Sequence, residues 1–435
     1  MEIGISIKTI FSRSSAKVLE FIAEGGQGGV YKVLYNNEEK ALKWYKKSFI
    51  TSVNDKTQLN FYDNLKKNIE RGTPSDDFLW PIDITEWSDG TFGYIMNLKP
   101  DGYYELTDFL LCSVRFKSYK RVIDAAMNIV SAFRQLHNKG YSYQDLNDGN
   151  FFINPQTGKI LICDNDNVVP NGEDTGIVGK PRYMAPEVVL GKTKPNTLSD
   201  RFSMSVILYA LFCLNHPLEG KKHLVPALTP KIQEELYGSN PLFIMDPKNK
   251  ANGPHHIIHK NSLKIWPVLP DYIREIFLKA FNEKSFSKPS ARPTEIEWLK
   301  VFTRFRSNII SCKCGNEIFA ANSSTLVCEK CSTVAKIAFE FNIDQYRIPA
   351  VKGSRIYKCQ ISVVDDNQAL DPIALVKENP KTGKLYVENK SDKNWNAITT
   401  KGESRKVAPN EHVPLKVGIK LTINDQLVLI EEKNK

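Results

Sequence analysis

The segment YSYQDLNDGNFFINPQTGKILICDND, residues 141–166, carries three oxygen-bearing side chains whose spacing could support chemistry. Asp145 and Asn150 lie five positions apart in a polar turn, and Asp164 ends a short apolar run. Carboxylate and carboxamide oxygens are ligands that hard cations such as Mg²⁺ prefer. Such oxygens beside short strands suggest that the segment binds a cation together with a phosphate.

A glycine-rich stretch, AEGGQGGVYKV at residues 23–33, precedes this segment. Glycine lets backbone N–H groups approach a phosphate closely, although a plain hairpin turn would have the same composition. Lys43 follows fourteen residues after Gly29, on a predicted strand. A strand lysine that faces the same cleft can hold phosphate oxygens, whereas a lysine considered alone would be a solvated strand residue.

The hydrophobic pattern predicts a small β lobe followed by a larger α lobe. Predicted strands cover residues 18–45, in three segments, and 91–98; predicted helices cover 57–72, 119–140 and 269–284. Gly72 and Gly140 are expected to end two of these helices. The apolar run 202–214 is shorter than a membrane span requires and is expected to be a buried core helix.

The ordered set of motifs resembles the bacterial eukaryotic-like (Hanks-type) Ser/Thr protein kinases over about residues 18–305. The matching positions are Gly25, Gly28 and Val30 of the glycine-rich loop, Lys43 of the strand motif, Asp145 and Asn150 of YQDLNDGN, Asp164 of DND, Glu187 of YMAPE, Asp200 of SDRFSMS and Arg292 of SARPT. The resemblance implies an α+β bilobal kinase fold. It also implies a pairing of Arg292 with Glu187, and Asp200 as an anchoring acid.

The same resemblance implies a role for each position in an ATP- and Mg²⁺-dependent phosphotransfer to protein. Lys43 and the loop residues Gly25, Gly28 and Val30 would hold the phosphates, and the backbone of Asn97 to Lys99 would bind adenine. Asp145 would be the catalytic aspartate that orients or deprotonates the acceptor hydroxyl. Asn150 and Asp164 would hold Mg²⁺.

Several positions depart from the family pattern. Gln144 replaces the arginine that receives an activation-loop phosphate, so we expect activity without phosphorylation of Thr175. Asn147 replaces the lysine that contacts the γ-phosphate, and Lys180 replaces a threonine. Asn165 and Asp166 replace the Phe-Gly of the third motif.

These departures leave alternatives open. The helical acid that pairs with the strand lysine in the family could be Asp63 or Glu70. An active Ser/Thr protein kinase is favoured because the phosphate- and metal-holding residues are all present. The alternatives are a nucleotide-binding pseudokinase scaffold and a kinase of a small-molecule hydroxyl.

Four of the eight cysteines form a cluster, CKCGNEIFAANSSTLVCEKC. Cys312, Cys314, Cys328 and Cys331 come from two turns, as in a four-thiolate Zn²⁺ site, and the segment resembles a zinc ribbon. Two disulfides or free core cysteines are the alternative. The apolar residues expected to form its small core are Ile318, Phe319, Leu326 and Val327.

The remaining sequence completes the predicted organisation. A kinase-like domain spans 1–305, with an N-lobe at about 15–99 and a C-lobe at about 100–305; a zinc ribbon spans 308–338; and an all-β tail spans 340–435. The tail resembles a forkhead-associated (FHA) sandwich without an evident phosphothreonine-reading set. The whole layout resembles bacterial kinases associated with a PP2C-type phosphatase and a von Willebrand A-type protein.

The composition limits the binding partners and the cellular location that we expect for this protein. The chain has 435 residues, 41% of them hydrophobic, and a formal net charge of +10, which permits an acidic partner without requiring one. We expect no nucleic-acid or membrane role. With Glu2 near its start and no long apolar core, the N-terminus does not resemble a secretory signal, and the expected location is cytoplasmic. The histidines of PHHIIH, at 255, 256 and 259, are expected in an exposed loop rather than at a metal.

Overall fold

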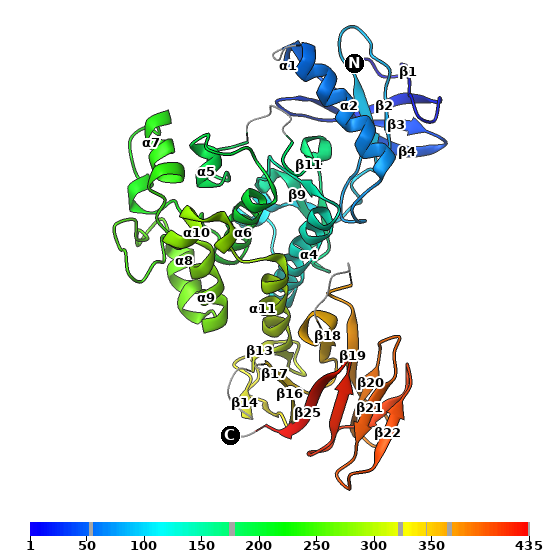
Figure 1. The fold of residues 1–435 in the computed structure, drawn as a ribbon, viewed down its shortest axis with the longest axis vertical. Helices are drawn as coiled ribbons and strands as arrows, with labels where there is room; N and C mark the ends of the chain where they lie inside the picture. Colours follow the sequence, from blue (N-terminus) through cyan, green and yellow to red (C-terminus); the bar gives the residue numbers. More distant parts are fainter. Residues whose placement is uncertain (52–54, 174–178, 321–324, 345, 363–367, 434–435) are drawn as a thin grey trace. The chain divides into compact units, whose positions relative to one another are not determined.

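The computed structural model describes residues 1–51, 55–173, 179–320, 325–344, 346–362 and 368–433 (Figure 1). The chain divides into two compact units. The first contains residues 1–115, 135–268 and 277–292, and the second contains 116–134, 269–276 and 293–435. Each unit has hydrophobic clusters of its own.

The first unit begins with an antiparallel sheet in the order β1-β2-β3-β4-β6-β5. Its strands are β1 (Ser6–Lys8), β2 (Ser15–Glu24), β3 (Gly28–Tyr35), β4 (Glu38–Tyr45), β5 (Asp83–Ile84) and β6 (Gly93–Met96). Asn36 and Asn37 join β3 to β4 with positive φ values of 50° and 64°, a conformation that favours a tight hairpin turn. The three predicted strands between residues 18 and 45 are confirmed.

Two helices follow β4, namely α1 (Lys47–Thr51) and α2 (Asp55–Arg71). Phe61, Tyr62 and Leu65 of α2 are buried in one cluster with Tyr45 and other residues of the sheet. Gly72 follows with φ +74° and donates its N–H to the carbonyl of Asn68, which ends the helix as expected.

The helical lobe of the first unit surrounds helix α6. Its helices are α3 (Leu106–Leu110), α5 (Pro186–Val189), α6 (Thr197–Cys213), α7 (Pro230–Glu234), α8 (Lys260–Ile265) and α10 (Glu283–Ser287), with the ends of α4 (Tyr119–Asn138) and α9 (Asp271–Ala280). Nearly every residue of α6 after Leu198 is buried, which explains its apolar run as a core helix. None of the described helices has the length and apolar character that a membrane crossing requires.

Short strands in this lobe carry the chemistry-bearing segment. They are β7 (Tyr104–Glu105), β8 (Tyr141–Ser142), β9 (Phe151–Ile153), β10 (Ile160–Ile162) and β11 (Val169–Pro170).

The predicted helix over 269–284 was too long, because α9 ends at Ala280. The side chain of Asn282 then accepts the N–H of Ser285 and begins α10 as a separate helix.

Two predicted anchors of the lobe are confirmed. The carboxylate of Asp200 accepts the backbone N–H groups of Tyr143 (2.7 Å) and Gln144 (3.3 Å), and it therefore fixes the turn before Asp145. The guanidinium of Arg292, which is nearly fully buried, donates two hydrogen bonds of 2.8 and 2.6 Å to the carboxylate of Glu187. Such a bidentate pair holds both position and orientation.

The second unit contains helix α11 (Glu295–Ser307), which leads directly into two hairpins. The hairpins consist of β12 (Ile309–Ser311) with β13 (Glu317–Phe319), and β14 (Thr325–Val327) with β15 (Val334–Lys336). Ile310, Ala320, Leu326 and Ile337 form their buried cluster. The expectation that Phe319 and Val327 belong to this core was wrong, since their side chains face solvent from the ends of the short strands.

The rest of the second unit is a β-sandwich. One sheet has the order β17-β16-β25-β24-β21-β22 and the other β18-β19-β20-β23. The strands are β16 (Phe339–Ile343), β17 (Tyr346–Pro349), β18 (Arg355–Tyr357), β19 (Pro372–Glu378), β20 (Leu385–Asn389), β21 (Trp395–Ile398), β22 (Ser404–Val407), β23 (His412–Pro414), β24 (Lys420–Ile423) and β25 (Gln426–Glu432). Buried residues of both sheets form one cluster, as expected when two sheets pack face to face.

Candidate functional site

Lys43 of β4 is the most buried cation of the candidate site. It pairs in register with Val30 of β3 and Tyr94 of β6, so these three side chains share one face of the sheet. The Lys43 Nζ lies 2.7 Å from Asp166 Oδ2, 3.2 Å from Asp164 Oδ1 and 2.8 Å from Gln27 Oε1. The glycine-rich turn and the DND segment therefore both contact the ammonium group of the strand lysine.

Asp166 is the closest of these ion-pair partners. Its side chain is fully buried, and its Oδ2 also accepts a 2.5 Å hydrogen bond from the hydroxyl of Tyr45. Burial by itself lowers the pKa of Lys43, but the carboxylates of Asp166 and Asp164 outweigh it and raise that pKa. The ammonium group therefore stays charged inside the protein.

This arrangement settles the choice between Asp63 and Glu70. Both side chains are exposed on α2, and Lys43 reaches neither of them among the described contacts. Helix α2 instead contributes Asn64 and Asn68, whose amides both donate to the carbonyl of Val168, at 2.9 and 2.8 Å. The acid that pairs with the lysine therefore comes from the DND segment and not from the helix.

The two residues before Asp166 have conformations that suit this pairing. Asp164 adopts a left-handed backbone conformation with φ 57°, and a single 3₁₀ turn from Asn165 to Asn167 follows it. The amide of Asn165 donates to the carbonyls of Leu79 and Ile162, both at 2.9 Å. Asn165 is thus anchored by hydrogen bonds where the family pattern has a phenylalanine.

Asp145 has an environment that suits a general base. Its half-buried carboxyl group has a raised pKa of about 6, because burial and the charges of Asp164 and Asp166 outweigh the opposing charge of Lys180. Its Oδ1 is buried and has no hydrogen-bond partner among the described residues. A buried acceptor of this kind is costly to leave unpaired, so it is available to a ligand's hydroxyl group.

The Lys180 side chain extends to Asn147, the residue that replaces a lysine of the family pattern. Its Nζ lies 3.1 Å from the Oδ1 of Asn147, whose own amide donates to the carbonyl of Asp145 at 3.2 Å. The N–H of Asn147 donates to Asn150 Oδ1 at 2.7 Å. A carboxamide oxygen has two lone pairs, so Asn150 Oδ1 keeps one for a cation.

The remaining predicted nucleotide contacts lie at or just beyond the ends of strands β2, β3 and β6. The Gly25 N–H donates to the Gly28 carbonyl at 2.8 Å across an exposed turn. A Cβ at Gly28 would lie 2.2 Å from the Trp44 carbonyl oxygen, so close strand pairing by itself requires this glycine. Past the end of β6, the Asn97 side chain accepts from Lys40, and Lys99 donates to the Tyr103 carbonyl.

Gln144 stands where the family pattern has an arginine. Its amide donates to the carbonyl of Glu173 at 2.6 Å, which ties the turn before Asp145 to Glu173. Thr175, the expected test position for regulation, lies outside the described residues.

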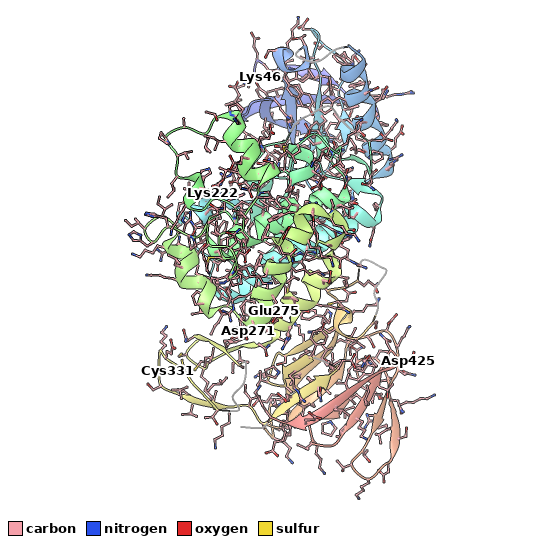
Figure 2. The ribbon with its side chains drawn as sticks, turned by 60° about the vertical axis from the view of Figure 1, so that its left-hand side comes forward. Lys46, Lys222, Asp271, Glu275, Cys331 and Asp425 are labelled. Carbon is pink, nitrogen blue, oxygen red and sulfur yellow. The ribbon has the colours of Figure 1, made fainter. Side chains whose placement is uncertain are left out.

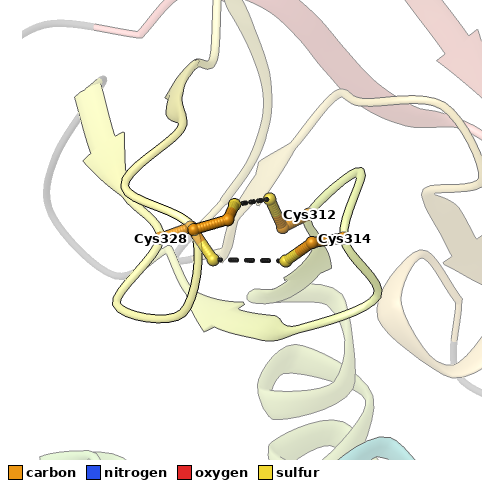
Figure 3. Close-up of side chains that lie close together, drawn as sticks. Cys312, Cys314 and Cys328 are labelled. Carbon is orange, nitrogen blue, oxygen red and sulfur yellow. Dashed lines mark hydrogen bonds between the residues drawn. The ribbon is translucent and has the colours of Figure 1, made fainter.

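The cysteine cluster is a second candidate site. The sulfur atoms of Cys312, Cys314, Cys328 and Cys331 lie within 4.8 Å of one another, with distances of 3.6 Å for the pairs Cys312–Cys331 and Cys314–Cys328 (Figure 3). Cys331 is labelled on the same segment in Figure 2. All four are free thiols, so two disulfides are not what holds the hairpins together.

The four cysteines outside the cluster differ in burial, and the histidines only partly follow the expectation. Cys213 and Cys359 are buried, Cys163 is partly buried and Cys112 is exposed. His256 is exposed, whereas His259 is buried and accepts the N–H of His255. Among the described residues, only the four clustered cysteines approach one another as metal ligands do.

Asp166, Tyr45, Gln27 and Lys180 are site residues that the sequence motifs did not assign. A signal existed for Asp166 and Lys180, because each stands at a position where the family has an uncharged residue. An extra acid beside the predicted metal ligand Asp164, in a chain whose helix lacks a well-placed glutamate, indicates a replacement partner for the lysine. Gln27 and Tyr45 carry no comparable signal.

We expect Asp166→Asn to weaken binding of a non-hydrolysable ATP analogue and to lower the midpoint of thermal unfolding. The substitution leaves the half-exposed Asp164 as the one remaining anionic partner of buried Lys43 among the described residues, and breaking a buried ion pair costs up to about 3–5 kcal/mol. Glu70→Gln is the matched control and should change neither quantity. Equal effects of the two substitutions on analogue binding, measured by calorimetry, would show that Asp166 is not the partner that matters.

Comparison with known proteins agrees with this geometry. Residues 16–237, more than half of the chain, match the family model described as "Protein kinase domain". The matched region includes Lys43, Asp145, Asn150 and Asp164.

Individual relatives are distant. Maternal embryonic leucine zipper kinase of Danio rerio is 28% identical over 181 residues, which are 38% of this chain and 26% of that protein. Protein kinase YegI of Escherichia coli O157:H7 is 22% identical over 318 residues, 67% of this chain and 45% of that protein. The crystal structure of the Mycobacterium tuberculosis PknI kinase domain aligns with a TM-score of 0.46 and 16% identity, covering 69% of this chain and 98% of that one.

The aligned region thus spans less than half of the length of these two curated relatives. The family itself rests on the model match over more than half of this chain, together with the ordered motifs that the fold brings to one site. The chain belongs to the protein kinase family.

Proposed function

We propose that this chain is an ATP- and Mg²⁺-dependent phosphotransferase that acts on serine or threonine hydroxyl groups of a protein. The observation that carries the proposal is the Asp145 carboxyl group, with its pKa raised to about 6 and a buried, unpartnered oxygen, interacting with Lys180 and Asp164. A positioned base titrating near the working pH is what transfer to a hydroxyl group requires.

The residues present fit ATP and Mg²⁺. Two carboxylate oxygens, Asp145 Oδ1 and Asp166 Oδ1, are buried without a hydrogen-bond partner among the described residues, and Asp164 is half-exposed beside them. Such a concentration of negative charge favours a hard dication with oxygen ligands. Asp164 and Asn150 would hold Mg²⁺, which would neutralise charge on the phosphates.

The chain's own residues have separate roles in the proposed phosphotransfer. In the proposed transfer, the acceptor oxygen forms a bond to the γ-phosphorus while the bond to the β-γ bridging oxygen breaks, and ADP leaves. Asp145 orients the hydroxyl and takes its proton. Lys43 holds a phosphate oxygen through the N–H that otherwise donates to Gln27, while Asp166 and Asp164 fix its ammonium group. Lys180, beside Asn147, supplies a positive charge near the transferred group.

Asp145→Asn should lower the rate of transfer from radiolabelled ATP by roughly 10²–10⁴, the range for loss of a positioned base, with ATP binding near normal. Asp164→Ala should abolish Mg²⁺-dependent transfer, because neutral Asn150 alone is a weak ligand for a hard dication. Full activity in either variant would contradict the proposal. Wild type that binds ATP but transfers nothing to any acceptor would indicate a scaffold, and transfer only to a small molecule would indicate the other alternative.

Activity should also fall as the pH decreases through about 6, because Asp145 works in its ionised form. Lys180 lowers the pKa of Asp145, so Lys180→Met should move this acidic limb to higher pH, whereas Lys180→Arg should leave it in place. Lys192→Met, at an exposed lysine of the same lobe, is the control. A pH profile of kcat that is identical in wild type and Lys180→Met would exclude this role for Lys180.

We further propose that Cys312, Cys314, Cys328 and Cys331 bind one structural Zn²⁺ and that the hairpins form a zinc ribbon. Four sulfurs placed about 2.3 Å from a tetrahedral zinc lie about 3.8 Å apart, close to the 3.6 Å separations observed. The pKa of Cys331 is lowered to about 6 by its hydrogen bonds with the side chain and the backbone of Thr333. That of Cys314 is raised to about 11, because neighbouring thiols outweigh a hydrogen bond from the Asn316 backbone.

The β-sandwich of residues 340–435 is proposed as an FHA-like module that docks proteins. Its two packed sheets support this assignment, which otherwise rests on the resemblance in strand rhythm. A PP2C-type phosphatase and a von Willebrand A-type protein are the proposed partners, from the same resemblance.

Elemental analysis should find one zinc per chain in wild type and in Cys112→Ser, but none in Cys328→Ser. Metal binding contributes roughly 10–16 kcal/mol in small zinc modules, so its loss should unfold the hairpins and expose residues 305–345 to proteases. ATP affinity should persist, because the proposed nucleotide contacts belong to the first unit. Zinc-free wild type with protease-resistant hairpins would overturn the assignment.

A further inference from the structure

The second unit contains a cavity whose charged lining is entirely positive. Its volume is about 420 Å³, and its walls come from the start of α4, the end of α11, the two hairpins and the turn before β18. The charged side chains in the lining are Lys120, Arg306, Lys313, Lys336, Lys352 and Arg355, and the lining contains no aspartate or glutamate. All of these residues belong to the same unit.

Two half-buried cations contribute the more enclosed part of the lining. Lys120 donates to the Ser311 hydroxyl at 2.7 Å, and burial together with the charge of Arg306 lowers the pKa of Lys120. The carboxylate of Asp124 is already shared between Arg306 and Arg121, at 2.7 Å each. This part of the cavity therefore holds positive charge in a partly desolvated setting.

The nearby glutamate is also engaged elsewhere. Glu317 of β13 accepts the backbone N–H groups of Tyr119 (2.7 Å) and Lys120 (3.3 Å), and thereby caps the N-terminus of α4. Its carboxylate stabilises the helix end rather than forming a close ion pair with the Lys120 side chain. The helix end and the hairpin that line the cavity are consequently fixed to each other.

Four exposed cations complete the lining. Lys352 lies 3.0 Å from Glu378. Within the part of the chain that the structure describes, no carboxylate lies at ion-pair distance from Lys313, Lys336 or Arg355. Four or more cations around one concavity repel each other unless an anion occupies it.

We propose that this cavity binds a small phosphorylated organic anion of about nucleotide size. Several converging cations, including the two arginines, suit the multiple charges and the geometry of phosphate oxygens. The apolar side chains of Ile310, Ile337 and Val351 also line the cavity and offer a surface to an organic group. The volume lies within the range of small-molecule sites. No residue of the proposed phosphotransfer site takes part, so this inference stands apart from that function.

The experiment is isothermal titration of the full zinc-loaded chain with inorganic pyrophosphate and, separately, with uridine diphosphate. The double variant Lys336→Gln/Arg355→Gln removes two lining charges and should weaken binding by at least about tenfold, equivalent to 1.4 kcal/mol. Lys381→Gln/Lys384→Gln removes the same charge from the exposed turn between β19 and β20 and should leave the affinity within about twofold. Tighter binding of uridine diphosphate than of pyrophosphate identifies the contribution of the apolar wall.

Thermal unfolding and zinc content, measured on each variant, exclude loss of folding as the cause. A third variant, Lys120→Gln, tests the enclosed part of the cavity separately and should also weaken binding. Absence of pyrophosphate and uridine diphosphate binding in wild type would overturn the proposal. So would an equal loss of affinity in the two double variants, because binding would then follow net charge and not the cavity.

Discussion

The buried ion pair between Lys43 and Asp166 is the interaction on which the organisation of the candidate site depends. An ammonium group with almost no solvent exposure cannot remain charged without a close anion, and Asp166, which is fully buried, provides one at 2.7 Å. The hydroxyl of Tyr45 satisfies the same carboxylate oxygen. Because Asp164 and Asp166 lie in one short turn, the pairing that positions the lysine also positions the proposed metal ligand.

This pairing differs from the pairing that the family pattern implies for the lysine. In the family that this chain belongs to, a lysine paired with a helical glutamate makes activity sensitive to the position of that helix. Here α2 presents the amides of Asn64 and Asn68 to the Val168 carbonyl and leaves its own acids in solvent. The lysine and the proposed metal-binding segment are therefore tied to each other directly, and Gln144 ties the catalytic turn to Glu173. Both features fit a site that is assembled without phosphorylation.

Local pattern and motif order were enough to predict the three strands around Lys43, the core helix α6, the Arg292–Glu187 pair and the convergence of the four cysteines. The strands and the core helix follow from short-range periodicity, the cysteine convergence follows from the spacing of the four cysteines, and the Arg292–Glu187 pair follows from the resemblance to the kinase family. The role of Asp166 was not predicted, although its position beside Asp164 carried a signal, because its partner lies 123 residues away in sequence and the fold brings the two side chains together. The break between α9 and α10 was missed because Asn282 caps a new helix within a continuous amphipathic pattern. The exposure of Phe319 and Val327 was missed because strands of three residues bury few of their side chains.

The most direct test of the central claim is a double-mutant cycle on the free energy of unfolding with Lys43→Met, Asp166→Asn and the double variant. Residues in one ion-pair network show coupling energies of about 0.5–3 kcal/mol, and we expect the upper half of that range for this buried pair. The parallel cycle of Lys43→Met with Glu70→Gln should give a coupling of less than about 0.5 kcal/mol. Additive effects for Lys43 and Asp166, together with clear coupling between Lys43 and Glu70, would contradict the account.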